Sequence, residues 1–500
     1  MSSQIVVGSS STIDKQSKYK QLLSTSRLRD TTETRDADLE TLSDKGRIVR
    51  SAPFRRLQSK AQVFSMARTG TVRTRLTHSL ESSNYGELIG ETLARKLIDA
   101  KSLHPDLRFS FVQTVENACL LHDIGNPPFG HMGEYAIRDW FRKNNEALSA
   151  SCQNVPHKDS HLNAYAQFDG NPHGFRIITR LQWLNDEYGM NLTCALLAAS
   201  LKYLGGSGSK FTKKIGYFPS EEAAVKKVWE VVGLATDKEG LPVQRHPLSF
   251  LMEAADDIAY CLSDIEDAIE RRVVSEAEFL KWMRSRKMRP DELIQRQQKD
   301  KRVSKGQKRA CNTLMSNSDY HFFRLSLSND LVQRAVDSYL RNEDRILSKS
   351  VDQAMDKSLF ATDPEATKWL ELLKEFSSSK VYRSREAIET ELAGLNAITG
   401  FLDAYKEIMI LSTEEYQMLS PKRKTDPKPD REFRYPILAL LYSLLPPKYC
   451  LAYDCATERN SRLEPVHRIQ LIVDYLAGMT DSHVLKIYNM INGSQQFGLE

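Results

Sequence analysis

An apolar segment that runs directly into a histidine and an aspartate constrains the fold of this chain most strongly. Apolar residues recur with helical spacing between residues 111 and 121, so this segment predicts a buried helix. The helix leads into His122 and Asp123. Gly125 and the prolines at 127 and 128 then end the helix and force a turn before another helix begins. The His-Asp pair is therefore predicted to lie at the edge of the core, on the wall of a cavity.

Two other segments carry residue types that such a pair needs as partners. His78 follows Arg75 by three residues, so both side chains share one face of a predicted helix. Further along, Asp256, Tyr260 and Asp264 recur at a spacing of four, opposite an apolar stripe. Periodicity alone favours a solvated acidic face at these positions. Converging imidazole and carboxylate donors would instead bind a divalent metal.

The order of these motifs, Arg-x-x-His, His-Asp and Asp-x-x-x-Tyr-x-x-x-Asp, resembles that of the HD-domain nucleotide phosphohydrolases. Longer blocks extend the resemblance to bacterial deoxyguanosine triphosphate triphosphohydrolases, namely residues 46–64, 72–79, 122–134, 168–176 and 474–481. The first forty residues and the segment from about 275 to 430 match less clearly. The resemblance implies an all-α fold, with an HD-domain helical core and additional C-terminal helices.

A metal site follows from the resemblance. It assigns manganese or magnesium to four side chains, His78, His122, Asp123 and Asp256. A rotation of the third helix would present Asp257 in place of Asp256, but only Asp256 keeps the spacing of four to the tyrosine of the motif.

The resemblance also implies a catalytic pair. Glu134 follows His131 by three residues, so its carboxylate can orient the imidazole and raise its basicity. His131 would act beside the α-phosphate, either on the attacking water or on the departing 5′ oxygen.

Ten further side chains are expected to contact the substrate. Arg75, Asn126, Lys202 and Tyr203 would bind the triphosphate, together with Lys213 or Lys214, of which we favour Lys214. Gln62 and Val63 resemble residues that meet the sugar and base, where an amide binds the 3′ hydroxyl and an apolar side chain crowds out a 2′ hydroxyl. Tyr260 would stack under the deoxyribose beside Asp264, and Arg468 resembles an arginine that reaches the active site.

Composition sets the domain organisation. A chain of 500 residues exceeds one ordinary core, and only 18 prolines and 23 glycines favour long helices. We expect a flexible N-terminal tail over residues 1–40, the catalytic core over 41–275, a basic connecting segment over 276–310 and a C-terminal helical region over 311–500 that completes the site. Residues 420–430 are expected to form an exposed linker.

The sequence also limits where the protein works. The longest apolar run, residues 436–445, is shorter than the roughly 20 residues that span a bilayer. The N-terminus lacks the basic and apolar regions of a signal peptide, and none of the seven cysteines has zinc-ribbon spacing. We therefore expect a cytoplasmic protein with reduced thiols and no membrane segment.

Positive charge concentrates in one segment, although the formal net charge is only +5. Residues 281–309 hold twelve lysines and arginines against three acids. Such a surplus can bind a phosphate backbone, so single-stranded DNA is a candidate partner. A solvated connection explains the segment equally well, because it contains only one aromatic residue.

Three functions are compatible with the sequence. The resemblance implies an enzyme that hydrolyses dGTP, or other dNTPs, at the α-phosphate to a deoxynucleoside and tripolyphosphate, and that controls dNTP pools as a homo-oligomer, a hexamer or tetramer. A phosphodiesterase or 5′-nucleotidase of the HD superfamily would use the same metal ligands but has no reason to keep the blocks at 46–64 and 474–481. A nucleic-acid-binding protein with a regulatory HD site is disfavoured by the intact His131–Glu134 pair.

Overall fold

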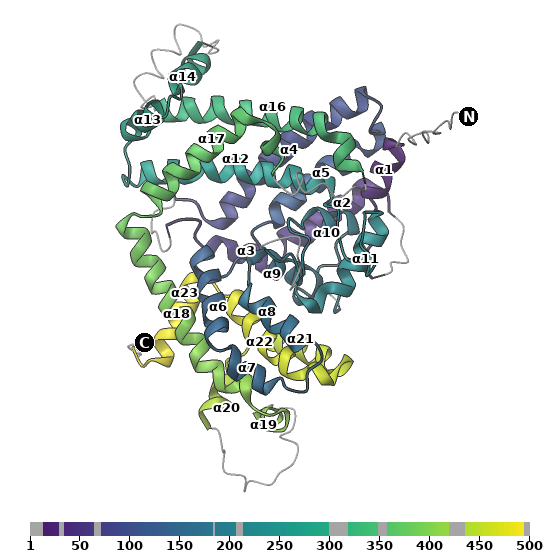
Figure 1. Cartoon of the computed structure of the whole chain (residues 1–500), viewed down its shortest axis with the longest axis vertical. Coiled ribbons are helices and arrows are strands. Elements are labelled where there is room, and N and C mark those ends of the chain that lie inside the picture. The colour runs from purple at the N-terminus through teal and green to yellow at the C-terminus, as the bar shows by residue number, and fades with distance from the viewer. Residues whose placement is uncertain are drawn as a thin grey trace, which may run out of the picture.

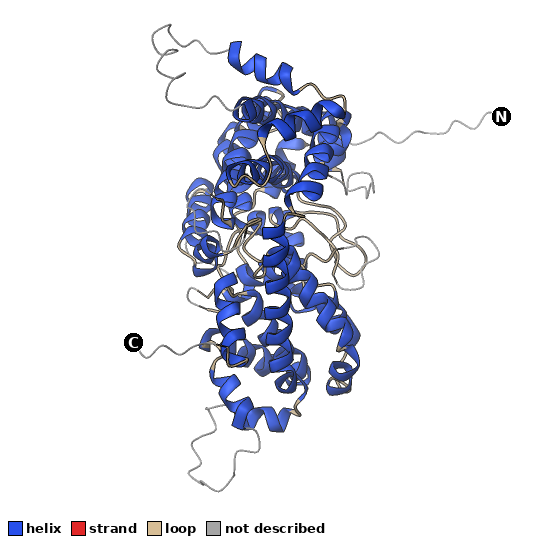
Figure 2. Cartoon of the chain, turned by 90° about the vertical axis from the view of Figure 1, so that its left-hand side faces the viewer, coloured by secondary structure: helices blue, strands red, loops and turns tan. Residues whose placement is uncertain are grey.

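The computed structural model describes residues 14–29, 35–64, 72–183, 186–206, 214–299, 319–348, 358–419 and 436–494. These residues form helices joined by loops, and the described ranges contain isolated bridges but no strand (Figure 2). The prediction of an all-α fold is therefore confirmed. No helix in these ranges has the length and apolar character needed to cross a bilayer.

The half of the molecule drawn at the top of Figure 1 is built around a central helix, α5. Buried side chains lie on all sides of α5, from Ser110 and Phe111 to Asn117 and Leu121, so it is an interior helix. The helices of this half are α1 (Lys15–Leu22), α2 (Ala37–Val49), α3 (Ala52–Arg56), α4 (Arg75–Asp99), α5 (Arg108–Leu121), α9 (Gly170–Arg176), α10 (Cys194–Ala199), α11 (Glu222–Val232), α12 (Pro247–Glu270), α13 (Glu276–Ser285), α14 (Pro290–Lys299), α16 (Asp319–Leu347) and α17 (Pro364–Phe376).

A glycine lets α4 and α5 approach closely. A Cβ atom added at Gly86 would lie 2.6 Å from the sulfur of Cys119 on α5, a contact that no side chain tolerates. The close packing of these two helices fixes the ends at which His78 and His122 stand.

The half drawn at the bottom of Figure 1 is a second group of helices. Its helices are α6 (Gly130–Lys143), α7 (Asn145–Ser151), α8 (Lys158–Ala166), α18 (Arg385–Ile410), α19 (Thr413–Leu419), α20 (Pro436–Ser443), α21 (Pro447–Arg459), α22 (Glu464–Ala477) and α23 (Asp481–Ile491). Within it, α6 packs against α18 and α8, and α18 also packs against α22 and α23. The turn over residues 122–129 joins the two halves, as the glycine and prolines within it predicted.

The expected N-terminal tail over residues 1–40 needs correction within the described ranges. Residues 15–22 form α1, whose Tyr19 and Leu22 are buried. The hydroxyl of Tyr19 lies 3.0 Å from that of Tyr339, and Lys15 pairs with Glu343 at 2.7 Å. These contacts with α16 are remote in sequence, so local composition could not reveal them.

The described part of the basic segment, residues 276–299, is mostly helical rather than a solvated connection. It contains α13 and α14, and Phe279, Met283 and Ile294 are buried. The rest of this segment and the linker expected over 420–430 lie outside the described residues.

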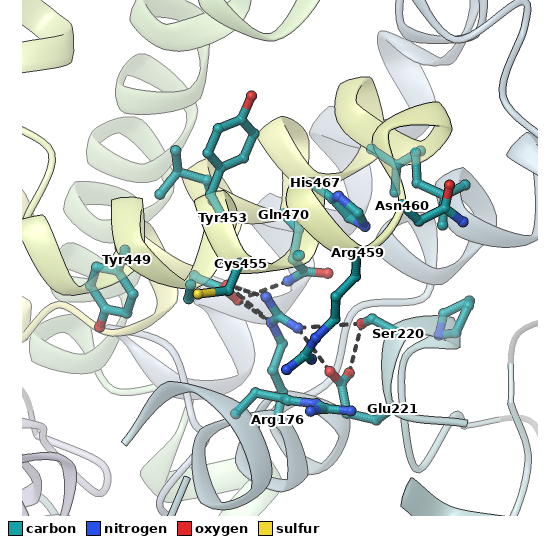
Figure 3. A pocket seen from close by; sticks show the side chains of 18 of the residues that line it. Arg176, Ser220, Glu221, Tyr449, Tyr453, Cys455, Arg459, Asn460, His467 and Gln470 are labelled. Atoms are coloured by element: carbon teal, nitrogen blue, oxygen red, sulfur yellow. Dashed lines mark hydrogen bonds and ion pairs between the residues drawn. The ribbon is translucent and has the colours of Figure 1, made fainter. Parts of the chain in front are cut away.

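A buried arginine ties α9 to the end of the chain. The Nε and Nη2 atoms of Arg176 donate to the carboxylate of Asp474 on α22 at 2.8–3.0 Å, and Nη1 donates to Glu221 at 2.8 Å (Figure 3). The side chains of Asp474 and Glu221 are 2% and 0% exposed. Removal of the arginine would leave two buried carboxylates without a cation.

We expect Arg176→Ala to lower the free energy of unfolding by about 3–5 kcal/mol, the cost of breaking a buried ion pair from one side. Chemical denaturation of the purified variant measures this loss. Arg385→Ala is the control, because that arginine is 93% exposed and its one ion pair among the described residues is with Glu389 on its own helix. Equal unfolding midpoints for the two variants would contradict the assignment.

Candidate metal centre and catalytic site

The four side chains that the family resemblance assigns to a metal come from α4, α12 and the turn after α5. His122 and Asp123 directly follow the last residue of α5. His78 lies in the first turn of α4, where a capping box between Thr74 and Thr77 starts the helix. Asp256 comes from the middle of α12. Two of the ligands therefore lie within helices, and the other two lie in the turn that directly follows α5.

The donor atoms of these side chains converge. The Nε2 atoms of His78 and His122 lie 3.2 Å apart, and Oδ1 of Asp256 lies 3.2 Å and 3.4 Å from them. Oδ1 of Asp123 lies 3.6 Å from Nε2 of His122. Ligand atoms of His78, His122 and Asp123 all lie within 4.8 Å of one another. Two imidazoles and two carboxylates at these separations form a site suited to a divalent metal ion.

Hydrogen bonding fixes the tautomer of one ligand. Nδ1 of His122 lies 2.6 Å from the carbonyl oxygen of Cys119. A carbonyl only accepts, so Nδ1 carries the proton and, in the neutral ring, the lone pair of Nε2 faces the site. Metal-binding histidines characteristically make this second bond to a carbonyl or carboxylate. The residues present therefore fit a metal.

The electrostatics of the cluster favour positive charge. Burial alone lowers the pKa of His122, but the carboxylates of Asp256 and Asp123 outweigh it and raise the pKa to about 9. Burial raises the pKa of Asp256, yet the two histidines and Lys202 hold it well below its usual range. A divalent cation supplies the charge that this environment stabilises.

The neighbouring carboxylate on α12 points elsewhere. Asp257 accepts from Nζ of Lys374 at 2.9 Å and from the hydroxyl of Ser358 at 3.4 Å. The rotation of α12 therefore presents Asp256, not Asp257, to the two histidines.

Arg75 connects the metal ligands with the next turn. Its Nη1 donates to Oδ2 of Asp123 at 2.9 Å. A Cβ atom at Gly130 would lie 2.3 Å from Nη2 of the same guanidinium, and Gly130 has a φ of +51°. Only glycine combines this backbone conformation with that space. The arginine therefore lies between the metal centre and the start of α6.

The candidate catalytic pair stands in the first turn of α6. Nδ1 of His131 lies 3.1 Å from Oε2 of Glu134, and the histidine side chain is 89% exposed. Glu134 is buried, and its Oε1 accepts the backbone N–H of Gly170 at 2.7 Å. An oriented and accessible imidazole results, with Nε2 directed away from its partner.

Several expected phosphate contacts surround the metal ligands. The amide of Asn126 donates to Oδ1 of Asp123. Nζ of Lys202 lies 3.9 Å from Oδ2 of Asp256 and 3.3 Å from Glu253, which the sequence did not single out.

A second group of residues expected to contact the phosphates begins with Tyr203, the residue after Lys202. The ring of Tyr203 lies 5.4 Å from Nζ of Lys214, which pairs with Asp169 at 2.8 Å. Asp169 precedes the glycine bound by Glu134, so this group adjoins the catalytic pair. Lys213, the alternative to Lys214, lies outside the described residues.

The acidic face of α12 is packed against other helices, with Asp264 buried and Asp256 and Tyr260 partly buried, so the solvated alternative is wrong. Asp264 accepts the hydroxyl of Tyr382 at 2.6 Å, and burial raises its pKa to about 6 despite that bond. The ring of Tyr260 lies 5.3 Å from Nζ of Lys374. The packing of later helices on this face, which local periodicity cannot report, explains the difference.

Two residues that the sequence analysis missed hold the site segments together. Oδ2 of Asp481 accepts the N–H of Ala61 at 3.0 Å, and its Oδ1 accepts the N–H of Phe129 at 3.0 Å. Lys60 is buried and donates to the carbonyl oxygens of Asn126 and Ala477. Both residues fall inside the blocks at 46–64 and 474–481, and this was their only signal in the sequence.

The hydrogen bond of Asp481 to Ala61 also helps to position the residues expected to contact the sugar and base. Gln62 and Val63 directly follow Ala61, and Oε1 of Gln62 is buried without a hydrogen-bond partner among the described residues. An acceptor in this state is available to a hydroxyl donor.

Arg468 occupies a different place from the one expected. Its guanidinium donates to the carbonyl oxygens of Ile408 and Leu411 at 3.1 Å and 2.7 Å and pairs with Glu464. The side chain is 0% exposed. A nucleotide could reach it only if these bonds broke, so within this chain Arg468 stabilises the junction of α18 and α22.

Known proteins resemble this chain in sequence. The HD domain family matches residues 75–157. The chain is 32% identical to a deoxyguanosinetriphosphate triphosphohydrolase of Klebsiella pneumoniae, covering 90% of this chain and 93% of the relative. It is 32% identical to that of Salmonella typhimurium, covering 91% and 94%, and 34% identical to that of an Enterobacter species, covering 90% and 93%. Identity of this extent over nearly the whole of both chains shows that the protein belongs to the deoxyguanosinetriphosphate triphosphohydrolase family of HD-domain proteins.

Proposed function

We propose that this protein hydrolyses dGTP at the α-phosphate and releases deoxyguanosine and inorganic tripolyphosphate. Water attacks the α-phosphorus, the bond to the 5′ oxygen breaks, and that oxygen leaves with a proton as the sugar hydroxyl. The observation that carries the proposal is the placement of Arg75 between a buried two-histidine, two-carboxylate cluster and the turn that bears His131. The relatives are named for dGTP, which supports the choice of substrate.

Manganese fits the donor set better than magnesium. His78, His122, Asp123 and Asp256 would hold the ion, and magnesium prefers ligands that are all oxygen. When bound, the ion neutralises charge on the phosphate oxygens and polarises the α-phosphorus. Arg75 and Lys202 add fixed positive charge beside it, where negative charge develops in the transition state.

His131 supplies proton transfer in this proposal. Glu134 accepts from its Nδ1, so the neutral imidazole presents the lone pair of Nε2. That atom takes a proton from the attacking water, and the departing 5′ oxygen, which lies on the opposite side of the phosphorus in an in-line displacement, takes its proton from solvent. Glu134 holds the ring in this orientation.

Selection of the substrate is assigned to side chains near the metal centre. Asn126, Tyr203 and Lys214 would bind the triphosphate. Tyr260 would stack against the deoxyribose, with Asp264 beside it. Gln62 would accept the 3′ hydroxyl, while Val63 would crowd out a 2′ hydroxyl.

Other expectations from the sequence stay predictions. They are a cytoplasmic location, assembly into a hexamer or tetramer, and binding of single-stranded DNA. Two arginines of the basic segment already have acidic partners, since Arg284 pairs with Asp291 at 2.6 Å and Arg289 with Glu292 at 2.9 Å. These pairs reduce the attraction that the segment offers to a polyanion.

Product analysis tests the proposed reaction. The protein is incubated with dGTP and Mn²⁺ in ¹⁸O-labelled water, with the other dNTPs and GTP in parallel. Deoxyguanosine without label and tripolyphosphate with one labelled oxygen are expected. Formation of dGDP or dGMP as first products, or label in the 5′ hydroxyl, would contradict it.

We expect His131→Ala to lower kcat by about 10²- to 10⁴-fold, the range for a lost general acid–base group. Its Mn²⁺ content should equal that of the wild type, because the imidazole is not a ligand. The control is His104→Ala, a half-exposed histidine remote in sequence from the site. Turnover of His131→Ala near the wild-type rate would remove this residue from the mechanism.

Asp481→Asn tests the positioning of the catalytic turn. An amide keeps one acceptor oxygen but turns its NH₂ group toward one of the two backbone N–H donors, at a cost of about 1–3 kcal/mol. We expect kcat to fall by at least about fivefold, with Mn²⁺ content unchanged. Asp106→Asn, a change at an 87% exposed side chain, is the matched control. Equal steady-state kinetics of Asp481→Asn and the control would show that the hydrogen bonds of Asp481 are not needed to position the catalytic turn.

A further inference from the structure

A separate cavity opens where α9 and α8 face the helices α21 and α22 (Figure 3). Its volume is about 330 Å³, at the small end of the range for ligand pockets. None of the residues proposed above to hold the metal, the water or the nucleotide lines it. The cavity is therefore distinct from the proposed active site.

The acidic side chains of this cavity are all bound to arginines. Asp474 and Glu221 both pair with Arg176, and Glu187 pairs with Arg459. Gln470 is also satisfied, because it accepts from Tyr165 at 2.9 Å and donates to Asp474 at 2.8 Å. These acidic side chains and Gln470 therefore already have ion-pair or hydrogen-bond partners within the wall of the cavity.

One arginine of the wall lacks such a partner. Within the described ranges, no carboxylate lies within 4.0 Å of the guanidinium of Arg180, which is partly buried. Burial lowers its pKa, and the positive charges of Arg459 and Arg176 lower it further against the opposing effect of Glu221. A partly buried cation without a counter-ion is unfavourable, so an anion in the cavity would be stabilised.

A second donor and several apolar surfaces complete the cavity. The imidazole of His161 on α8 makes no hydrogen bond to any described residue. The rings of Trp183, Tyr449 and Tyr453 also line the wall. The cavity thus combines two unsatisfied donors with aromatic faces.

We propose that this cavity binds a small phosphorylated metabolite, whose phosphoryl group pairs with Arg180 and whose remainder lies against the aromatic side chains. A phosphoryl group fits better than a carboxylate, because its three terminal oxygens accept from the arginine fork and from a second donor together. Arg176 keeps its two carboxylates, and the ligand takes the place that no protein carboxylate fills at Arg180.

Isothermal titration of the full-length protein tests this proposal. Inorganic phosphate is one probe and dGMP the other, both without added metal. Binding at the active site is common to all variants, so the difference between the wild type and Arg180→Ala isolates the cavity. We expect Arg180→Ala to weaken this binding by about tenfold or more, as for a lost charged hydrogen bond. Arg95→Ala, at a 67% exposed arginine, should bind like the wild type.

A second variant removes space without removing charge. Ala456 lines the cavity, so Ala456→Phe should abolish the same binding while Arg180 stays in place. Basal turnover of dGTP by both variants should stay within about twofold of the wild type, since neither residue contacts the proposed active site. The turnover measurement therefore tests the proposed reaction independently of the proposed binding of a phosphorylated ligand in the cavity.

The two probes distinguish the source of the phosphoryl group. Equal affinity for phosphate and dGMP indicates that the site contacts only the phosphoryl group. Tighter binding of dGMP indicates that the site also contacts the nucleoside. Binding of both probes that is unchanged in Arg180→Ala and in Ala456→Phe would overturn the proposal. If Arg180→Ala does not fold, Arg180→Gln, which keeps much of the side-chain length but removes the charge, gives the same decision together with Ala456→Phe.

Discussion

The proximity of two buried imidazole nitrogens to two carboxylates is the interaction on which the rest of the structure depends. Nε2 of His78 and Nε2 of His122 lie 3.2 Å apart, with Asp256 in contact with both. Such a cluster is costly unless a cation occupies it. It also needs three helices that cannot shift relative to one another, and α4, α5 and α12 are packed as an interior group for this reason.

The chemistry proposed for this protein takes place at the border between two groups of helices. The metal ligands belong to the group around α5, whereas His131 and Glu134 belong to α6 in the other group. Three long-range ties keep these groups in register. Asp481 binds Ala61 and Phe129, Lys60 binds Asn126 and Ala477, and Arg176 binds Asp474. The C-terminal helices therefore position the site without supplying a metal ligand.

Features set by local physics were predictable from the sequence. The apolar spacing of residues 111–121 and the breakers after Asp123 correctly predicted where α5 ends. The apolar stripe along α12 indicated the opposite face as the one that bears Asp256. In the sequence, only the spacing of four between Asp256 and Tyr260 favoured Asp256 over the adjacent Asp257 as the metal ligand. Packing confirms that the two carboxylates point to different partners.

Features set by contacts between distant segments were not predictable. The polar composition before residue 40 gave no sign that Tyr19 reaches Tyr339. The sequence around an arginine on an apolar helix does not reveal whether its side chain faces a substrate. The side chain of Arg468 instead faces carbonyl groups at the end of α18. Asp481 lies in a short matching block, but its role depends on two backbone N–H groups more than 350 residues away.

Equilibrium binding of Mn²⁺ to a pair of neighbouring variants tests the metal centre most directly. Asp256→Asn and Asp257→Asn change adjacent carboxylates of one helix, and only the first lies against the histidines. The titration is followed by the electron paramagnetic resonance signal of free Mn²⁺. We expect Asp256→Asn to bind Mn²⁺ at least about tenfold more weakly than the wild type, whereas Asp257→Asn binds it as the wild type does. Equal binding by the wild type and Asp256→Asn, or a loss confined to Asp257→Asn, would contradict the account.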